Sequence, residues 1–425
     1  MAIATETQTQ QEIQQTSQLQ AVAGGIAAPE GFQVSGVKAG IKNMEKPDVA
    51  LIVSQVPATV AAMMTTNVVK AAPIQWCQTV LSQQSKVSAI VVNSGNANAC
   101  TGKQGMVHAH QMAETTASAL GLDLHQILVS STGVIGVPLP IEKVLAGIQN
   151  AATVLSDTAD KAEDAATAIM TTDTYTKQVA VTVEIGGKIV TIGGIAKGSG
   201  MIHPNMATML AFVTTDADIE QSLLQKALQE SVADSYHMIS VDGDTSTNDM
   251  VAVLANGLAE NQTITEENED FAKFKTALQY VNQTLAQQIA KDGEGATKFL
   301  AVTVKGAATK QDAQALGRAV VSSSLVKAAF YGEDANWGRI IGAMGTAGVN
   351  FDTTLVSMTA TSSQGELEFL KAGVPLPFDE AHAKQVLSEK DIAVTIQLVD
   401  GTAQATAWGC DLSHEYVSIN GDYRT

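Results

Sequence analysis

Apolar residues in the first half of the chain gather in short runs that are typical of strands. Val49–Val53 and Val87–Val92 are nearly continuous apolar runs, which predict buried strands. Residues 179–192 alternate between apolar and polar positions around Gly186-Gly187, a pattern that predicts a hairpin. Further strands are predicted at residues 32–38, 127–136, 209–213, 298–305, 355–359, 392–399 and 402–408.

Other segments repeat their apolar residues every three or four positions, as helices do. The clearest case runs from Phe271 to Ile289, and Asp292-Gly-Glu-Gly295 predicts its end because glycine can cap a helix. Helices and strands mix without a regular strand–helix–strand repeat, which predicts an α+β fold in layers rather than a single parallel sheet. Further helices are predicted at residues 104–120, from about 141, up to about 170, and at 221–235, 311–330 and 379–388.

Length and composition indicate the number of domains and the size of the hydrophobic core. The chain has 425 residues, of which 45% are hydrophobic, enough for one large domain or two to three ordinary ones with a substantial core. Residues 1–20 contain seven glutamines and few large apolar residues, which predicts a disordered tail that we extend to residue 24.

Charge and cysteine content indicate which partners and which cellular compartment to expect. The net charge is −18, with 14 acidic and 11 basic residues before position 208 and 29 acidic and 14 basic residues after it. This balance argues against nucleic acid or an anionic membrane as a partner. No apolar stretch reaches the ~18 residues that span a bilayer, and the N-terminus lacks a signal-peptide pattern. Three widely spaced cysteines form no disulfide or metal pattern, so we predict a cytoplasmic protein.

The segment Lys197–Leu210 holds the most suggestive chemistry in the chain. A threonine hydroxyl is a weak nucleophile unless a base lies beside it, and cleavage just before a threonine supplies one in the freed α-amine. That amine has an ordinary pKa near ~8, closer to neutral pH than that of lysine. The Ala207–Thr208 bond is a candidate for such a cut, because Gly198, Gly200 and Pro204 permit a tight preceding path. Most Ala-Thr pairs belong to ordinary strands or helices, so these residues alone do not establish self-cleavage.

Other motifs lack the residues that their chemistry requires. Gly198-Ser-Gly200 follows its lysine, whereas a phosphate loop places the lysine after the glycines. Asp242–Asn248 resembles the start of a calcium loop but has Thr247 where the glycine belongs and Val253 where the glutamate belongs. The histidines form no HExxH pattern and no Gly-x-Ser-x-Gly elbow is present, so we predict no metal site and no serine hydrolase motif.

Five motifs together resemble the ornithine acetyltransferase family, the ArgJ family of glutamate N-acetyltransferases. They are Lys197–Leu210, Ile169–Thr174, Ser131-Thr-Gly133, Asp334–Arg339 and the C-terminal Ile419–Thr425. These motifs are long and specific, several occur in the family's order, and the similarity runs from about residue 25 to the C-terminus.

The resemblance implies a precursor that cuts itself between Ala207 and Thr208. The products would be an α chain (25–207, after the tail of residues 1–24) and a β chain (208–425), assembled as an α2β2 heterotetramer. The implied fold is a helix–sheet–sheet–helix sandwich, like that of N-terminal-nucleophile hydrolases but with different connectivity. The implied reaction is ping-pong: N-acetylornithine acetylates Thr208 and ornithine leaves, and glutamate then takes the acetyl group. No cofactor is implied, and the use of acetyl-CoA as a second donor stays open.

The resemblance also assigns roles to individual residues. Thr208 is the nucleophile, and its freed α-amine is the base. Thr132 and the Gly133 N–H form the oxyanion hole, Lys197 contacts a substrate carboxylate, and Glu294 contacts an amino group. The complete set of implied substrate-binding residues is Thr174, Lys197, Thr208, Glu294, Asn420 and Thr425. Two alternatives remain: an amidohydrolase or aminopeptidase with an N-terminal threonine, and a non-catalytic amino-acid-binding protein in which Thr208 is never freed.

Overall fold

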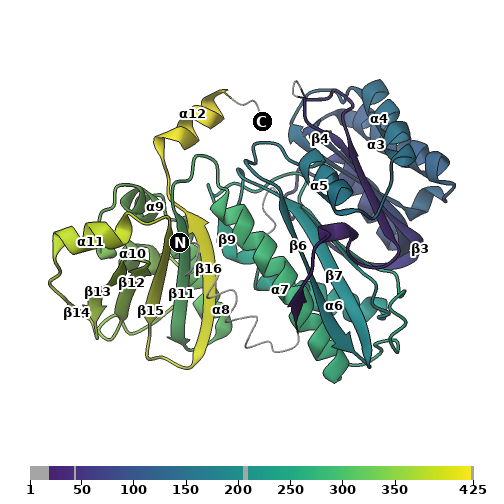
Figure 1. Cartoon of the computed structure of the whole chain (residues 1–425). Coiled ribbons are helices and arrows are strands. Elements are labelled where there is room, and N and C mark those ends of the chain that lie inside the picture. The colour runs from purple at the N-terminus through teal and green to yellow at the C-terminus, as the bar shows by residue number, and fades with distance from the viewer. Residues whose placement is uncertain (1–18, 43–44, 204–208, 423–425) are drawn as a thin grey trace.

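The computed structural model describes residues 19–42, 45–203 and 209–422, and it folds them around two β-sheets with helices on both sides (Figure 1). The first sheet has nine strands in the order β1-β6-β7-β8-β10-β3-β4-β5, with β2 paired to β3. Its strands are β1 (Gln20–Ala21), β2 (Phe32–Val37), β3 (Val49–Met64), β4 (Lys86–Asn96), β5 (Ile127–Val134), β6 (Lys177–Ile185), β7 (Lys188–Lys197), β8 (Leu210–Thr215) and β10 (Met250–Ala255).

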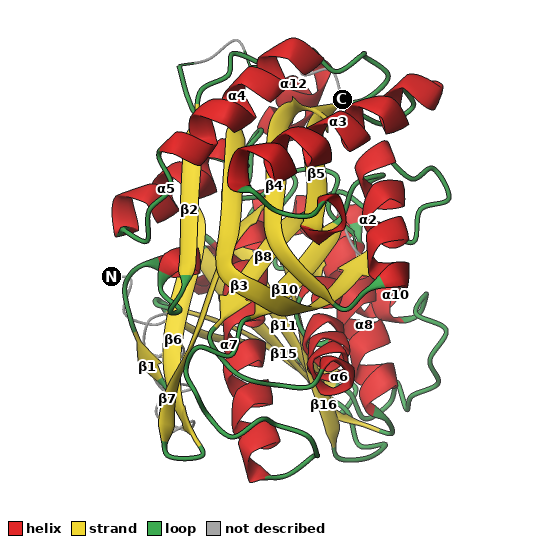
Figure 2. Cartoon of the chain, turned by 90° about the vertical axis from the view of Figure 1, so that its right-hand side faces the viewer, coloured by secondary structure: helices red, strands yellow, loops and turns green. Residues whose placement is uncertain are grey.

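The long strand β3 belongs to both halves of this sheet. Its first part pairs with β2 and β4, and its last six residues, Thr59–Met64, pair with β10. The two halves are stacked, with one helix layer outside each of them (Figures 1 and 2). The outer layers are α2 (Ala72–Gln83), α3 (Gly102–Leu120), α4 (Ile141–Thr153) and α5 (Ala159–Ala168) on one side, and α6 (Gln221–Ala233) and α7 (Glu269–Lys291) on the other.

Alternating side chains of the central strands divide the core between these layers. Leu210 and Phe212 of β8 pack in the core built with β2–β5 and α2–α5. Their neighbours Ala211 and Val213 pack in the core that contains α6 and α7. A strand with apolar residues at successive positions is therefore buried on both faces, as the continuous run from Leu210 to Val213 predicts.

The second sheet has seven strands in the order β14-β13-β12-β15-β11-β16-β9. Its helices share one continuous core with α6 and α7, so the two sheets form a single folded unit. The strands are β9 (Ile239–Ser240), β11 (Phe299–Ala307), β12 (Ser357–Ser362), β13 (Gly365–Lys371), β14 (Val374–Pro375), β15 (Asp391–Gln397) and β16 (Ala403–Cys410). The helices are α8 (Lys310–Ser322), α9 (Ser324–Tyr331), α10 (Trp337–Met344), α11 (Glu380–Leu387) and, at the C-terminus, α12 (His414–Asp422).

The predicted α+β class with two sheets and the hairpin at Gly186-Gly187 are confirmed. The predicted single helix over 311–330 is wrong, because α8 and α9 are separate helices. Ser323 is extended between them (φ −73°, ψ 114°), and its hydroxyl accepts a hydrogen bond from the Val326 N–H at 3.4 Å as the cap of α9.

The predicted disordered tail of residues 1–24 is wrong for its last six residues. Residues 1–18 lie outside the described residues, but Leu19 is buried and Gln20–Ala21 pair with β6. Within the described ranges, no helix is both long enough and apolar enough to cross a bilayer.

Candidate active site

Five of the predicted site residues line one pocket of about 120 Å3. It lies where the ends of β5 and β7, the loop after α7 and helix α12 meet. Thr132, Gly133, Lys197, Glu294 and Asn420 all line it, although they are spread over almost 290 positions of the sequence. The fold therefore brings together most of the set that the resemblance implies.

Thr132 and Gly133 end the parallel strand β5 beside β4. Thr132 is 3% exposed, and no described residue hydrogen-bonds to its hydroxyl, which leaves that group available to a ligand. Gly133 has φ 127°, and a Cβ at this position would lie 2.4 Å from the Gly95 carbonyl carbon. Only glycine fits this close approach of the two strands, so the turn that carries the predicted oxyanion hole is fixed by packing.

Lys197 is the last residue of β7 and is 2% exposed. Its strand partner is Leu210, which lies two residues after Thr208 in the sequence. Burial lowers the pKa of Lys197, while the charge of Asp173 opposes this shift. An ammonium group held in so buried a position is suited to pair with an incoming carboxylate.

Glu294 and Asn420 meet in the wall of the same pocket. Asn420 Nδ2 donates a hydrogen bond to Glu294 Oε2 at 2.7 Å, and the Glu294 N–H donates to the Ser199 carbonyl at 3.0 Å. A Cβ on Gly200 would lie 2.3 Å from the Glu294 carboxyl carbon. The Gly-Ser-Gly sequence therefore lets the carboxylate lie directly against the backbone.

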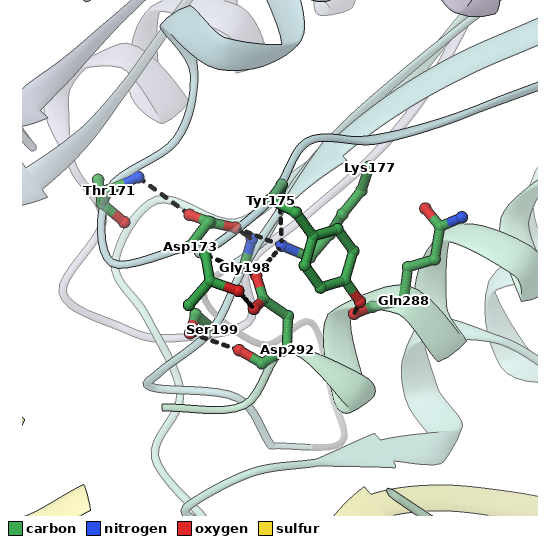
Figure 3. A network of polar contacts seen from close by, with 9 residues as sticks. Thr171, Asp173, Tyr175, Lys177, Gly198, Ser199, Gln288 and Asp292 are labelled. Carbon is green, nitrogen blue, oxygen red and sulfur yellow. Dashed lines mark hydrogen bonds and ion pairs between the residues drawn. The ribbon is translucent and has the colours of Figure 1, made fainter. Parts of the chain in front are cut away.

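A buried ion network connects the backbone next to Lys197 with the segment that carries Glu294 (Figure 3). Lys177 Nζ lies 2.8 Å from Asp173 Oδ1 and 2.5 Å from Asp292 Oδ2, and its side chain has no exposed surface. Burial alone would raise the pKa of Asp173, but the ammonium groups of Lys177 and Lys197 hold it well below its ordinary value. The Gly198 N–H donates to Asp173 Oδ1 at 2.7 Å, which anchors the chain just after Lys197.

Thr174 belongs to this network rather than to the pocket wall. Its N–H donates to Asp292 Oδ2 at 3.0 Å, and its hydroxyl donates to Asp292 Oδ1. Thr171 and Thr172, from the same loop, line the pocket. The role of Thr174 as a substrate contact stays a prediction. Because its hydroxyl already donates to Asp292, the structure favours a role for Thr174 in positioning Asp292.

Three of the predicted site residues, Ala207, Thr208 and Thr425, lie outside the described residues. The residue that follows Thr208 is described: the Met209 N–H donates to Asp249 Oδ1 at 3.1 Å. Burial raises the pKa of the Asp249 carboxyl well above its ordinary value.

The segment before β10 contributes residues that the sequence did not single out as functional. Asn248 Nδ2 donates to the Ala97 carbonyl at 2.7 Å and to the Ser131 carbonyl at 2.8 Å, which fixes the residue before Thr132. Asp242, which also lines the pocket, accepts hydrogen bonds from the N–H groups of Met201 and Ile202. The sequence feature that could have identified Asp242 and Asn248 is the polar run Asp242–Asn248, because a polar loop next to a buried strand often carries binding residues.

Comparisons with known proteins agree with the motifs. A model described as the ArgJ family matches residues 33–425. The arginine biosynthesis bifunctional protein ArgJ of Symbiobacterium thermophilum is 54% identical over 406 residues, covering 95% of this chain and 99% of that protein. The protein of the same name from Bacillus subtilis is 47% identical over 408 residues, covering 96% and 98%.

A crystal structure of the arginine biosynthesis bifunctional protein ArgJ from Bacillus halodurans is 46% identical. It covers 50% of this chain and 98% of its own, with a TM-score of 0.47. The match of the family model over nearly the whole chain, together with relatives near 50% identity, settles the classification. This chain belongs to the ArgJ family.

Proposed function

We propose that the chain transfers the acetyl group of N-acetylornithine to glutamate through an acetyl-Thr208 intermediate, within arginine biosynthesis. The observation that carries this proposal is the single pocket shared by Thr132, Gly133, Lys197, Glu294 and Asn420. Its volume of about 120 Å3 is of the order needed for a small polar substrate such as an amino acid. The names of relatives at 47–54% identity support the pathway.

The first chemical step is cleavage of the Ala207–Thr208 bond, which frees the α-amine of Thr208 as a base. This would divide the molecule into an α chain that ends at Ala207 and a β chain that begins at Thr208. Pairing of β7 with β8, and of β3 with β10, joins residues from both sides of the cut. We therefore expect the two chains to stay associated, in an α2β2 assembly located in the cytoplasm.

Acyl transfer then uses the pocket residues in turn. Thr208 Oγ attacks the acetamide carbonyl carbon, and its proton passes to the α-amine. The developing oxyanion is held by the Thr132 hydroxyl and the Gly133 N–H, fixed donors that stabilise charge formed only in the transition state. The C–N bond breaks and ornithine leaves with the proton. The amine of glutamate attacks the acetyl ester in the reverse sequence of steps.

Charge distribution in the pocket fits both substrates. Lys197 pairs with the α-carboxylate that N-acetylornithine and glutamate share. The Glu294 carboxylate, oriented by Asn420, receives an amino group of ornithine. Both contacts come from groups that are less than 10% exposed, which strengthens them relative to contacts in water.

Dependence on glutamate tests this function. The processed protein should release about one ornithine per Thr208 from N-acetylornithine alone, and should turn over continuously once glutamate is added. Continuous release without glutamate would identify an amidohydrolase, in which water resolves the ester. No release under either condition, with an uncut chain, would support a non-catalytic amino-acid-binding protein.

A further inference from the structure

One two-residue segment contacts both of the strands that carry the proposed acyl-transfer groups. Asn248 and Asp249 come directly before β10, and they are 4% and 1% exposed. Asn248 bonds to β5, the strand with the two oxyanion donors, and Asp249 bonds to the residue that follows the nucleophile in the sequence. Neither residue is among those that the family resemblance implies for the site.

The Asn248 amide has no hydrogen left for a substrate. Its two N–H hydrogens go to the carbonyl oxygens of Ala97, at 2.7 Å, and Ser131, at 2.8 Å. Its Oδ1 accepts a hydrogen bond from the Thr247 hydroxyl at 2.5 Å. Asn248 lines the pocket, but because its donors are already used, it orients its neighbours rather than binding a substrate.

The two bonds from Asn248 hold the ends of β4 and β5, where the oxyanion donors lie. In the described sheet β5 is the last strand and pairs only with β4, so no second strand fixes its outer side. Ala97 follows the last residue of β4, and Ser131 directly precedes Thr132. A shift of the Ser131 carbonyl would therefore also move the Thr132 hydroxyl and the Gly133 N–H, because the three residues are consecutive.

Asp249 and Met250 hold the peptide groups of Met209, the residue after Thr208. The Met209 N–H donates to Asp249 Oδ1 at 3.1 Å, and the Met250 N–H donates to the Met209 carbonyl at 3.2 Å. Asp249 Oδ2 accepts no hydrogen bond from any described residue. A buried carboxyl oxygen without a partner costs stability. The contact with Met209 therefore explains a polar acceptor at this position better than stability does.

We propose that Asn248 and Asp249 are positioning residues that hold the oxyanion donors and the strand of the nucleophile at a fixed separation. Because consecutive Cα atoms stay about 3.8 Å apart, the two contacts cannot move independently. Acyl transfer is sensitive to this separation, since a misplacement of about 1 Å can cost about 10²-fold in rate. The proposal rests on the acetyl-Thr208 function above and adds two residues that act through Thr132, Gly133 and Thr208.

A double-mutant cycle with Thr132 tests the role of Asn248. Asn248→Ala should lower kcat about tenfold to 100-fold with little change in KM for N-acetylornithine. In the Thr132→Ala background, the same substitution should cost at least about threefold less, because one of the two donors that it displaces is already absent. Asn282→Ala is the matched control: this buried asparagine on α7 bonds to the Ser231 hydroxyl and should change the melting temperature but not kcat.

Variants of Asp249 test the side of the nucleophile. Asp249→Leu removes the acceptor of the Met209 N–H and should lower kcat at least about tenfold without a marked fall in melting temperature. Asp249→Asn keeps an acceptor oxygen and should stay within about threefold of the unsubstituted kcat. In the control Asp216→Leu, at the other end of β8, both lost carboxyl oxygens accept backbone N–H groups. This control should lower the melting temperature and leave kcat unchanged.

Each kcat is counted per cut chain, as measured by intact mass, so that a defect in cleavage is not read as a defect in transfer. If Asn248→Ala does not fold, Asn248→Asp, which keeps the shape of the side chain, takes its place in the cycle. Equal losses from Asn248→Ala in both backgrounds would overturn the proposal, and so would an unchanged kcat in Asp249→Leu. No turnover in the unsubstituted protein, with both substrates present, would instead refute the acetyl-Thr208 function itself.

Discussion

At the scale of single residues, the site depends on two glycines that allow other groups to approach the backbone closely. Gly133 lets the end of β5 approach Gly95 of β4, and Gly200 lets the Glu294 carboxylate lie against the backbone. Sequence motifs identified both segments as important, but only the packing explains why glycine is required. The individual roles of Thr132, Lys197 and Glu294 rest on the family resemblance and remain predictions.

The oxyanion role of Thr132 predicts a specific kinetic effect. Thr132→Ala should lower kcat by about 10²–10³ with little change in KM, because the lost donor stabilises charge that exists only in the transition state. Steady-state kinetics with varied N-acetylornithine will check this, and Thr132→Ser, which keeps the hydroxyl, should retain most of the activity. A raised KM with an unchanged kcat would make Thr132 a ground-state contact instead.

Gly200→Ala should lower catalytic activity while leaving the stability of the fold nearly unchanged. Its Cβ would displace the Glu294 carboxylate, the far end of a flexible side chain, so the change in melting temperature should be small. Because Glu294 is expected to receive an amino group of the substrate, kcat/KM should fall at least about tenfold. Gly332→Ala adds a methyl group 3.5 Å from its nearest neighbour and is the control. Full activity in Gly200→Ala would remove Glu294 from the site.

At the scale of elements, Lys177 on β6 connects the loop after α5 with the end of α7. The apolar patterns predicted most strands and the α7 helix, because burial on one or two faces leaves a clear period in the sequence. They missed α2, β10, α10, β13 and α12, and the two-residue strands β1, β9 and β14. The helix α12 is amphipathic only weakly, with no buried residue, and β10 follows a polar run that resembled a turn.

Removal of the Lys177 charge should destabilise the fold strongly. Lys177→Met leaves the Asp173 and Asp292 carboxylates buried without a cation, and breaking a buried pair in this way costs about 3–5 kcal/mol. Lys188→Met, which removes the exposed pair with Glu260, should cost less than about 1 kcal/mol. Urea unfolding measures both, and equal small losses would show that the network contributes little.

The loss of unfolding free energy in Lys177→Met should depend on pH, because the pKa of Asp173 depends on the Lys177 charge. In the unsubstituted protein this pKa is depressed, so its contribution to stability is complete above the ordinary value near ~3.9 and is lost as the pH falls. In Lys177→Met the unpaired buried carboxylates should have raised pKa values and become less costly once protonated. The difference in unfolding free energy should therefore be largest near neutral pH and shrink in acid. A difference that grows in acid would contradict this assignment.

At the scale of the whole molecule, the site is assembled from residues that no local pattern connects. Periodicity cannot tell that β7 pairs with β8, or that β3 continues into both halves of the nine-stranded sheet. The family motifs identified which residues belong to one site, which hydrophobic periodicity could not do. They also marked Asp334–Arg339 without a role, and the structure places Arg339 of that motif in a groove between α8 and α10.

The central claim is that Thr208 becomes a free N-terminal residue and carries the acetyl group. Intact mass under denaturing conditions, before and after incubation with N-acetylornithine alone, tests it most directly. We predict two fragments that break between Ala207 and Thr208, with only the C-terminal fragment becoming heavier by one acetyl group. The Thr208→Ala protein should stay uncut and gain nothing. A single uncut chain in the unsubstituted protein, with no added mass, would contradict the account.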